Sequence, residues 1–322
     1  MNGRQRIEAM LAGRPVDRCG YWTGHPHPDS LPGLLAHFDC PDTEALYQRL
    51  GDDLRWMPLW WSPAYPPGLF ADCQSPDDIE RFAWPDPDTV DFSEQLRQLE
   101  AAEGYYRLGG NPAMFFHWDC FQVFGGMGGY FEKMYTHPAV VHAFTRRIND
   151  IYLRLNRRLF EQAHGNMEAC KISHDLGTQT GLMMSPAMLE EFVFPYITEQ
   201  IDLAHEFNLK LLLHCCGSIR PILDRLIALG VDLLHPIQAL AAGMDAESLR
   251  PYRERLLFVG GIDVQRLLVH GTPRDIAVEV RRVARVLGPL VISPSHEAIL
   301  PDVPPANVEA LAQAVRELGG VG

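Results

Sequence analysis

The side chains best suited to chemistry follow four short apolar runs of the chain. These polar segments are Ser173–Gly177, His214–Gly217, Gly260–Asp263 and Ser293–Glu297. In a sheet of parallel strands, groups that follow successive strands gather at one face, where barrel enzymes carry their active sites. Packing alone does not explain polar residues that recur at the same end of several strands, so this face is expected to hold the functional site.

His214 and Cys216 form a His-x-Cys pair. In extended backbone, side chains two residues apart lie on the same side, so both can reach one ion while Cys215 points away. Imidazole and thiolate are donors that suit zinc. A further ligand must come from another strand end, and His296 and Asp175 are the obvious suppliers. Spacing alone leaves open the alternative that the cysteines are small buried residues and His214 is a hydrogen-bonded core histidine.

Other polar and aromatic residues near these segments are further candidates for the site. Asp175 could be a general base, a metal ligand or an anchor for the turn before Gly177. Gln179 and Asp263 are expected to bind substrate, although Asp263 follows two glycines and could instead cap the next turn. Trp118 is a further candidate for substrate contact, with packing as the alternative.

The elements that must position these groups alternate between strands and helices after Gly104. The expected strands are Tyr105–Leu108, Ala113–Phe116, Met167–Ser173, Leu209–Leu213, Asp232–His235, Leu256–Val259 and Leu290–Ile292. The expected helices are His137–Phe160, Pro186–Asn208 with Ser185 as N-cap, Ile219–Leu229, Ala246–Glu254, Pro273–Leu287 and Pro305–Leu318. Short apolar strands that alternate with amphipathic helices are typical of parallel βα units. The pattern predicts an α/β fold, a single (β/α)8 TIM-type barrel, rather than an open doubly wound sheet.

The first third of the chain has a different texture. A helix is expected over Ile7–Leu11 and a short strand over Cys19–Thr23, and the Trp- and Pro-rich segment Trp56–Phe70 excludes regular helix. No linker separates this part from the rest. We therefore expect one domain over residues 1–322, in which residues 1–104 are an N-terminal segment with cap and loop insertions and not a separate domain.

Composition limits the class of protein. The chain has 28 Lys and Arg against 41 Asp and Glu, a formal charge of −13, so a nucleic-acid partner is not expected. The longest apolar runs are far too short to span a membrane, and no export signal is visible. Seven cysteines are neither even in number nor dense, which is typical of reduced thiols. These observations predict a cytoplasmic globular enzyme.

Several motifs resemble the uroporphyrinogen decarboxylase superfamily. They are HDLGTQTGLMMSP, LLHCCGSI, GVDLLHPIQ, FVGGIDVQRLL and SPSHEAILPDVPPANVEA, and the likeness is continuous from His174 to the C-terminus. More narrowly, they are similar to its branch of cobalamin-linked methyltransferases, typified by methylcobamide:coenzyme M methyltransferase. The fold that this resemblance implies is again the (β/α)8 barrel.

The resemblance also implies a metal site. The methyltransferase branch holds zinc with a His-x-Cys pair, matched here by His214 and Cys216, and with a distant Cys in an SPGCG-like turn. The corresponding turn here is Ser-Pro-Ser-His, so His296 stands where that Cys would be. Decarboxylases of the family carry an Arg-rich segment after the first strand, where the carboxylates of the substrate are held. The segment here, GYWTGHPHPDSLPG, contains no arginine.

The leading hypothesis is a zinc-dependent methyltransferase that moves a methyl group between a small methylated substrate or thiol acceptor and methylcobalamin (a corrinoid) carried on a partner protein. The partner protein follows from the resemblance; the chain contains no DxHxxG-type cobalamin motif, so its sequence does not show whether it contacts cobalamin directly. The second hypothesis is a metal-independent decarboxylase of a tetrapyrrole or another carboxylic acid, in which Asp175 stabilises a protonated intermediate. The third is a non-catalytic corrinoid-binding barrel. A homodimer is expected, because superfamily members commonly dimerise and the Trp- and Pro-rich segment offers apolar surface.

Overall fold

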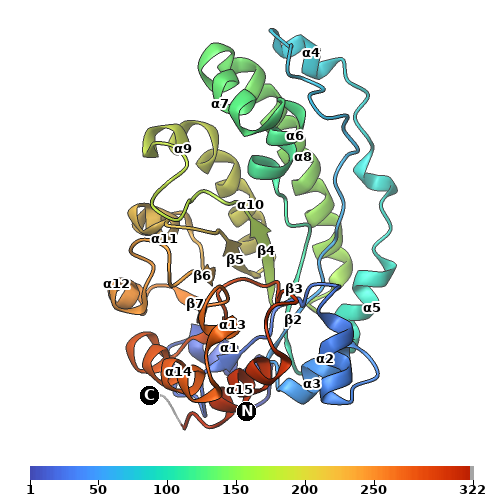
Figure 1. Cartoon of the computed structure of the whole chain (residues 1–322). Coiled ribbons are helices and arrows are strands. Elements are labelled where there is room, and N and C mark those ends of the chain that lie inside the picture. The colour runs from blue at the N-terminus through green and yellow to red at the C-terminus, as the bar shows by residue number, and fades with distance from the viewer. Residues whose placement is uncertain (320–322) are drawn as a thin grey trace.

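The computed structural model describes residues 1–319 and contains one eight-stranded parallel sheet rolled into a barrel (Figure 1). The strands are β1 Gly20–Tyr21, β2 Leu54–Trp56, β3 Tyr106–Gly109, β4 Ala169–Ser173, β5 Lys210–His214, β6 Leu233–Ile237, β7 Leu257–Ile262 and β8 Val291–Pro294. Their order is β1-β8-β7-β6-β5-β4-β3-β2. The Asp53 amide donates to the Tyr21 carbonyl across the remaining gap, at 2.8 Å. The barrel is therefore nearly closed, and the predicted (β/α)8 fold is confirmed.

Helices surround this sheet. The longer ones are α1 Gly3–Leu11, α2 Leu31–Phe38, α3 Thr43–Leu50, α5 Ser93–Ala101, α7 Gly126–Thr136, α8 Pro138–Ala163, α10 Phe194–Glu206, α14 Pro273–Leu287 and α15 Pro305–Arg316. The shorter ones are α4 Pro76–Glu80, α6 Phe121–Val123, α9 Pro186–Phe192, α11 Leu223–Leu229, α12 Ala246–Leu249 and α13 Leu267–His270. Among the described helices, none has the length and apolar character that crossing a membrane requires.

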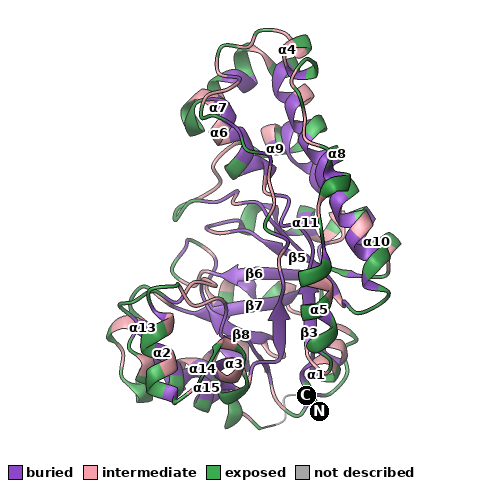
Figure 2. Ribbon diagram, turned by 90° about the vertical axis from the view of Figure 1, so that its right-hand side faces the viewer, coloured by how far each residue is buried: buried purple, intermediate pink, exposed green. Residues whose placement is uncertain are grey.

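The barrel has an apolar interior in its lower part, and α1 closes the bottom. Alternate residues of the strands point inward, as the two-residue period requires. The interior cluster therefore takes Leu212 of β5, whereas Leu211 and Leu213 join the layer between strands and helices. Ile7 of α1 belongs to the same interior cluster. Apart from the exposed Lys210 at the start of β5, the strand residues are buried (Figure 2).

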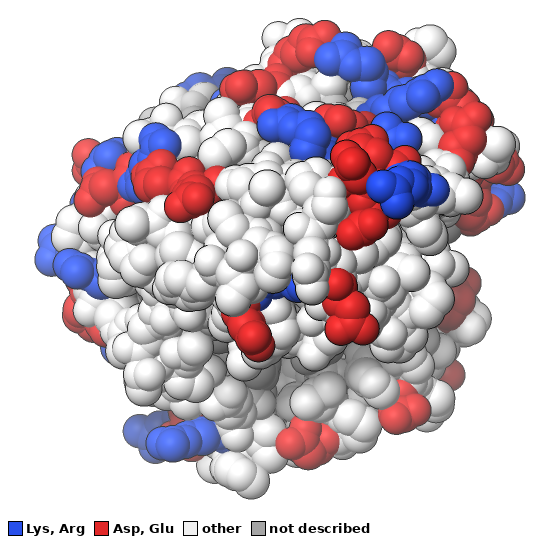
Figure 3. Space-filling model, turned by 90° about the horizontal axis from the view of Figure 1, so that it is seen from above, with Lys and Arg blue, Asp and Glu red and all other residues white. Residues whose placement is uncertain are grey.

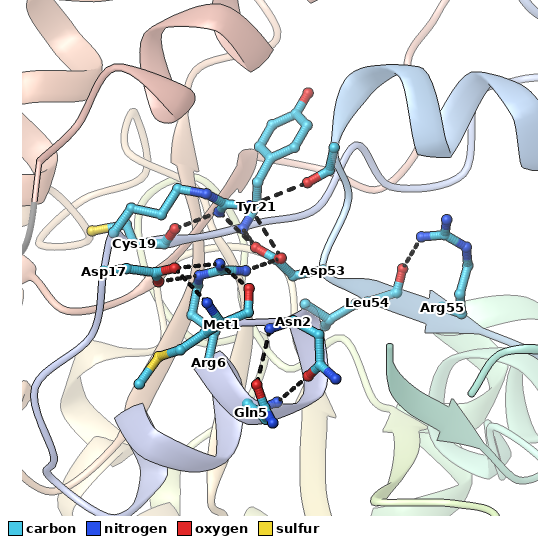
Figure 4. Close-up of polar contacts among 12 residues, drawn as sticks. Met1, Asn2, Gln5, Arg6, Asp17, Cys19, Tyr21, Asp53, Leu54 and Arg55 are labelled. Atoms are coloured by element: carbon cyan, nitrogen blue, oxygen red, sulfur yellow. Dashed lines mark hydrogen bonds and ion pairs between the residues drawn. The ribbon is translucent and has the colours of Figure 1, made fainter. Parts of the chain in front are cut away.

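Ion pairs tie the amino end of the barrel together (Figure 4). Arg18 donates to both carboxylate oxygens of Asp53 at 2.7 and 3.2 Å, and Arg6 donates to Asp53 and, at 2.7 Å, to Asp17. The Tyr21 amide also donates to Asp53, at 2.8 Å. Since Asp53 precedes β2 and Arg18 precedes β1, this network joins the two strands that the sheet ladder leaves unpaired.

A projection stands above the barrel on one side. The long helix α8 runs upward, and α4, α6 and α7 gather at its upper end (Figures 1 and 2). Helices α4 and α7 both contact α8. The Trp- and Pro-rich segment connects the barrel to this projection without helix, and it buries Tyr65 and Phe70 while Trp60 stays exposed.

Two expected elements are wrong. Ala113–Phe116 is not a strand, because the Asn111 side chain accepts a hydrogen bond from the Ala113 amide at 2.8 Å and the chain turns into a π-helix at Phe115–Cys120. The expected single helix Pro186–Asn208 breaks at Val193, where Pro195 prevents the helical hydrogen bond and the chain restarts as α10. Ser185 caps α9 as predicted, with its side chain accepting from the Met188 amide.

Candidate active site

The upper part of the barrel interior is polar. Along β4, β5, β6 and β8, the inward side chains are apolar near the amino end of the barrel and polar near its carboxyl end. The polar ones are Lys171 and Ser173 of β4, His214 of β5, His235 of β6 and Ser293 of β8. All of these polar residues are buried. Buried polar groups at the carboxyl ends of barrel strands are expected where a barrel binds ligands or performs chemistry.

One side of the His214 ring faces the predicted metal position. Its Nε2 atom lies 3.3 Å from Cys216 Sγ and 3.5 Å from Asp175 Oδ1. The potential ligand atoms of these three residues lie within 4.8 Å of one another. Zinc bonds of ordinary length at tetrahedral angles separate neighbouring ligand atoms by about 3.4–3.6 Å. The two distances from His214 Nε2 are therefore close to those between zinc ligands.

The other side of the His214 ring faces a carboxylate and a second imidazole. Nδ1 lies 3.1 Å from Glu297 Oε2 and 3.0 Å from His235 Nδ1. Glu297 Oε1 lies 3.3 Å from Lys171 Nζ, and the Lys171 side chain is completely buried. The ammonium group also lies 3.3 Å from the centre of the Trp56 ring, a cation–π contact.

Burial and charge act on these groups in opposite directions. Burial lowers the pKa of Lys171, while Glu297 works to raise it. Burial alone would raise the pKa of Glu297, but His214 and Lys171 hold it well below its usual range. Glu297 is therefore an ionised carboxylate at neutral pH.

Asp175 has a defined position beside the His-x-Cys pair. Its Oδ1 accepts a hydrogen bond from the Cys216 amide at 2.8 Å, and its own amide donates to His117 Nδ1 at 3.1 Å. Burial opposes ionisation, yet the neighbouring His214 and His117 leave the pKa of Asp175 lowered. Asp175 therefore anchors the neighbouring backbone and also lies among the potential metal ligands.

The Cys216 thiol is in an environment that disfavours its thiolate. Burial, followed by the charge of Asp175, raises the pKa of Cys216 above its ordinary value. A bound cation would supply the compensating charge, because metal coordination deprotonates a thiol. Thiol, imidazole and carboxylate together form a donor set that fits zinc. Cys215, by contrast, is packed in the outer layer and accepts from the Leu176 amide, as the alternation predicts.

His296 lies near this cluster but outside it. Its ring centre is 6.1 Å from that of His214. Among the described residues two groups have close potential ligand atoms, Asp175 with His214 and Cys216, and His214 with His235 and Glu297, and His296 belongs to neither. His296 Nδ1 accepts a hydrogen bond from the Ala298 amide at 3.0 Å. A neutral imidazole that accepts at Nδ1 carries its proton on Nε2, so in this arrangement Asp175 is better placed than His296 as third donor.

A cavity of about 370 Å³ adjoins His296 on the same face. Gln179 and Asp263 line it together with Gln238, whose side chain accepts from the Gly217 amide. The Asp263 carboxylate accepts from the amides of residues 265, 266 and 267, which is the capping role. Trp118 is 53% exposed on the π-helix and is not among the lining residues described. Substrate contact by these residues remains a prediction.

The cavity lies on a face with an uneven charge distribution. Seen from above, charged side chains are dense toward the upper edge, much of the face is uncharged, and acidic groups flank a hollow near its middle (Figure 3). Among the described residues, no lysine or arginine lines the cavity, whereas Asp263 and Asp302 do. The cavity therefore disfavours strongly anionic ligands.

The sequence did not single out Glu297, His235, Lys171 and His117 as site residues. The signal for Lys171 and His235 was present, because they occupy the same alternate positions as inward Ala169 and Leu233. Glu297 and His117 follow irregular segments, for which no periodicity predicts direction.

Comparisons with known proteins identify the family of the chain. Residues 122–318 match the family described as uroporphyrinogen decarboxylase. The uroporphyrinogen decarboxylase of Chlorobium limicola is 25% identical over 196 residues, which are 58% of this chain and 51% of that protein. The chain thus spans about half the length of the curated decarboxylases that it matches.

Two methyltransferases are also similar. Methylcobamide:CoM methyltransferase MtbA of Methanosarcina acetivorans is 25% identical over 127 residues, 39% of this chain and 36% of that protein. A methyltransferase from Methanosarcina mazei has the same fold, with a TM-score of 0.68 and 18% identity over 98% of this chain and 99% of that one. Because the family match covers well over half of the sequence, this chain belongs to the uroporphyrinogen decarboxylase family of enzymes.

Proposed function

We propose that this protein is a zinc-dependent methyltransferase that moves a methyl group between a small substrate and a corrinoid carried by a partner protein. The observation that carries the proposal is the donor set at the carboxyl ends of β4 and β5. His214 Nε2 lies 3.3 Å from Cys216 Sγ and 3.5 Å from Asp175 Oδ1. The similarity to MtbA, whose name describes methyl transfer from a cobamide, supports the same chemistry.

In this proposal His214 and Cys216 hold the metal, and Asp175 or His296 provides the third donor. Zinc, when bound, acts as a Lewis acid that lowers the pKa of a thiol or polarises the atom that carries the methyl group. Asp175 keeps Cys216 in place by accepting from its amide. A three-residue donor set leaves a position open for substrate, as catalytic zinc sites require.

The cavity beside His296 supports a small substrate without strong negative charge. Its volume of about 370 Å³ suits a compact molecule, and the described lining offers carboxylates and carboxamides rather than cations. A porphyrinogen with several carboxylates would find no charge partner there. This feature favours methyl transfer over decarboxylation of a tetrapyrrole.

Decarboxylation remains the second candidate because two observations favour it. The family match and several similar proteins carry the decarboxylase name. The lowered pKa of Asp175, which burial opposes and His214 causes, keeps an ionised carboxylate in the site, where it could stabilise a protonated intermediate.

One pair of assays separates the candidates. Purified protein is given methylcobalamin with a panel of small thiols, and in parallel uroporphyrinogen, with and without a zinc chelator. We expect methyl transfer, monitored as the loss of methylcobalamin absorbance. The transfer should stop when the chelator is added and return when zinc is restored. Decarboxylation that ignores the chelator would overturn the proposal in favour of the second candidate.

Assembly and location remain predictions. We expect a homodimer, which light scattering would report as twice the 36.3 kDa chain mass. A particle of single-chain mass at micromolar concentration would contradict it. We also expect the enzyme in the cytoplasm, where its thiols stay reduced.

A further inference from the structure

We propose that Glu297 is a positioning residue that fixes the tautomer of His214. In this assignment Glu297 accepts a hydrogen bond from the protonated Nδ1 of His214. The lone pair of His214 Nε2 then points toward Cys216 and Asp175. The inference deepens the proposed zinc site, but its first test needs no metal. Neutral imidazole has one N–H and one lone pair, so the partner of one nitrogen decides the role of the other.

Two groups compete for His214 Nδ1. His235 Nδ1 lies 3.0 Å away and Glu297 Oε2 lies 3.1 Å away. If His235 donates to His214, then His214 carries its proton on Nε2 and cannot bind a metal there. Glu297 can only accept, and hydrogen bonds to an ionised carboxylate are stronger than those between neutral groups. Glu297 therefore favours the tautomer that is ready for metal.

The surroundings hold Glu297 at this position. Its backbone carbonyl accepts from the His25 amide at 2.7 Å. Gly24 has φ +92°, and a Cβ there would lie 2.3 Å from the same carbonyl oxygen, so a glycine is required for this close approach. The loop after β8 is thus fixed against the loop after β1, with the Glu297 side chain directed at His214.

The charge of Lys171 favours one of two possible metal positions beside His214. His214, His235 and Glu297 form a second group whose potential ligand atoms lie within 4.8 Å of one another. The Lys171 ammonium already lies 3.3 Å from Glu297 Oε1 and is completely buried. A second cation beside it would be repelled in this low-dielectric interior. The metal therefore belongs on the Nε2 side, and Glu297 acts from behind the ring.

The direct test is nitrogen NMR of the imidazole groups in metal-free protein. Wild type should show His214 protonated on Nδ1. Glu297→Met removes the acceptor and should move a substantial fraction of His214 to the Nε2-protonated form, with Glu297→Gln intermediate. Glu254→Met, at an exposed position, is the matched control and should match wild type. An unchanged Nδ1-protonated His214 in Glu297→Met would overturn the assignment.

Cobalt(II) binding gives the second readout. Glu297→Met should lower cobalt affinity about 10–100-fold, the usual effect of losing such a partner, and keep the thiolate-to-cobalt absorption band. If Cys216→Ser leaves cobalt binding intact while Glu297→Met abolishes it, the metal lies among His235 and Glu297, and the inference is wrong. If wild type binds no metal but NMR shows the Glu297-dependent tautomer, the proposed function fails and the inference holds.

Folding needs its own check, because Glu297→Met leaves the Lys171 ammonium buried without its partner. The double variant Glu297→Met with Lys171→Met removes both charges. It should fold with native circular dichroism and show the same shift of His214 tautomer. A native-like double variant with wild-type tautomer would also overturn the assignment.

Discussion

The buried charges around Asp53 are paired at the amino end of the barrel, whereas the buried polar groups at the carboxyl end are incompletely paired. At the amino end Asp53 contacts Arg6 and Arg18 and accepts from the Tyr21 amide. At the carboxyl end, Ser293 Oγ and His235 Nε2 are buried without a hydrogen-bond partner among the described residues. The two ends belong to the same eight strands, so the fold alone does not require the difference.

We interpret this difference as one between structural polar groups and groups of the proposed site. Buried polar atoms in folded proteins are nearly always satisfied, and each exception calls for a specific explanation, such as a functional role or a bound ion or water. The amino-end network joins β1 to β2 through Arg6, Arg18 and Asp53. The carboxyl-end cluster places the potential metal ligands Cys216 and Asp175 close to His214, which is the arrangement that the proposed metal centre requires.

The largest expected effect on stability is at the amino end. Asp53→Asn leaves the buried guanidinium of Arg6 without its full charge partner, so we expect the free energy of unfolding to fall by about 3–5 kcal/mol. Asp175→Asn, at the other end, should cost less than about 1 kcal/mol in metal-free protein, because Asn keeps an acceptor for the Cys216 amide. Urea denaturation of both variants measures the contrast. Equal losses would remove the distinction between the ends.

The neighbouring carboxyl Asp52 sharpens the same point. It contacts the Thr23 amide and hydroxyl but no arginine, and burial raises its pKa to about 7. Folded protein therefore binds this proton more tightly than unfolded protein, so stability falls as pH rises from about 4 to about 7. The change from 3.8 to about 7 corresponds to at most about 4 kcal/mol.

Asp52→Asn should remove this pH dependence, because Asn imitates the protonated acid beside Thr23. The free energy of unfolding of wild type should fall between pH 5 and pH 8 more steeply than that of the variant. Denaturation curves at several pH values measure the two slopes. Parallel slopes would show that Asp52 is ionised in the folded protein.

The smallest expected effects distinguish the third metal donor. His296→Ala should lower zinc affinity 10-fold or more, about 1.4 kcal/mol, if His296 completes the site, and His296→Cys should retain the metal. If Asp175 completes it, as the distances favour, then Asp175→Asn carries that loss and His296→Ala has little effect. Competition titration with a chelating dye measures both. No change in either variant would contradict the proposed site.

The fold could be predicted from the sequence because its signals are local and periodic. Apolar runs such as Leu209–Leu213, alternating with amphipathic helices such as Pro273–Leu287, predict parallel βα units. Two of the errors lie where a single side chain or proline overrides the pattern, and the short strand β2 was not expected at all. Asn111 turns the chain before Phe115, and Pro195 interrupts a helix that periodicity makes continuous.

The candidate site could be predicted only in part. His214 and Cys216 share a strand end, so a two-residue spacing predicts that they meet. The position of Asp175 beside them depends on how β4 and β5 pair, which local sequence does not give. Glu297 contacts His214 across a loop more than eighty residues away in the chain, and the resemblance directed attention to its neighbour His296 instead.

The most direct test of the account is the zinc content of the purified protein. Wild type, prepared without chelator, should contain about one zinc per chain by atomic emission, and Cys216→Ser should contain almost none while keeping its native circular dichroism. Cys215→Ser, at the outward neighbouring position, is the matched control and should keep the zinc. Wild-type protein that contains no transition metal and takes up none on titration with zinc would contradict the proposed metal centre.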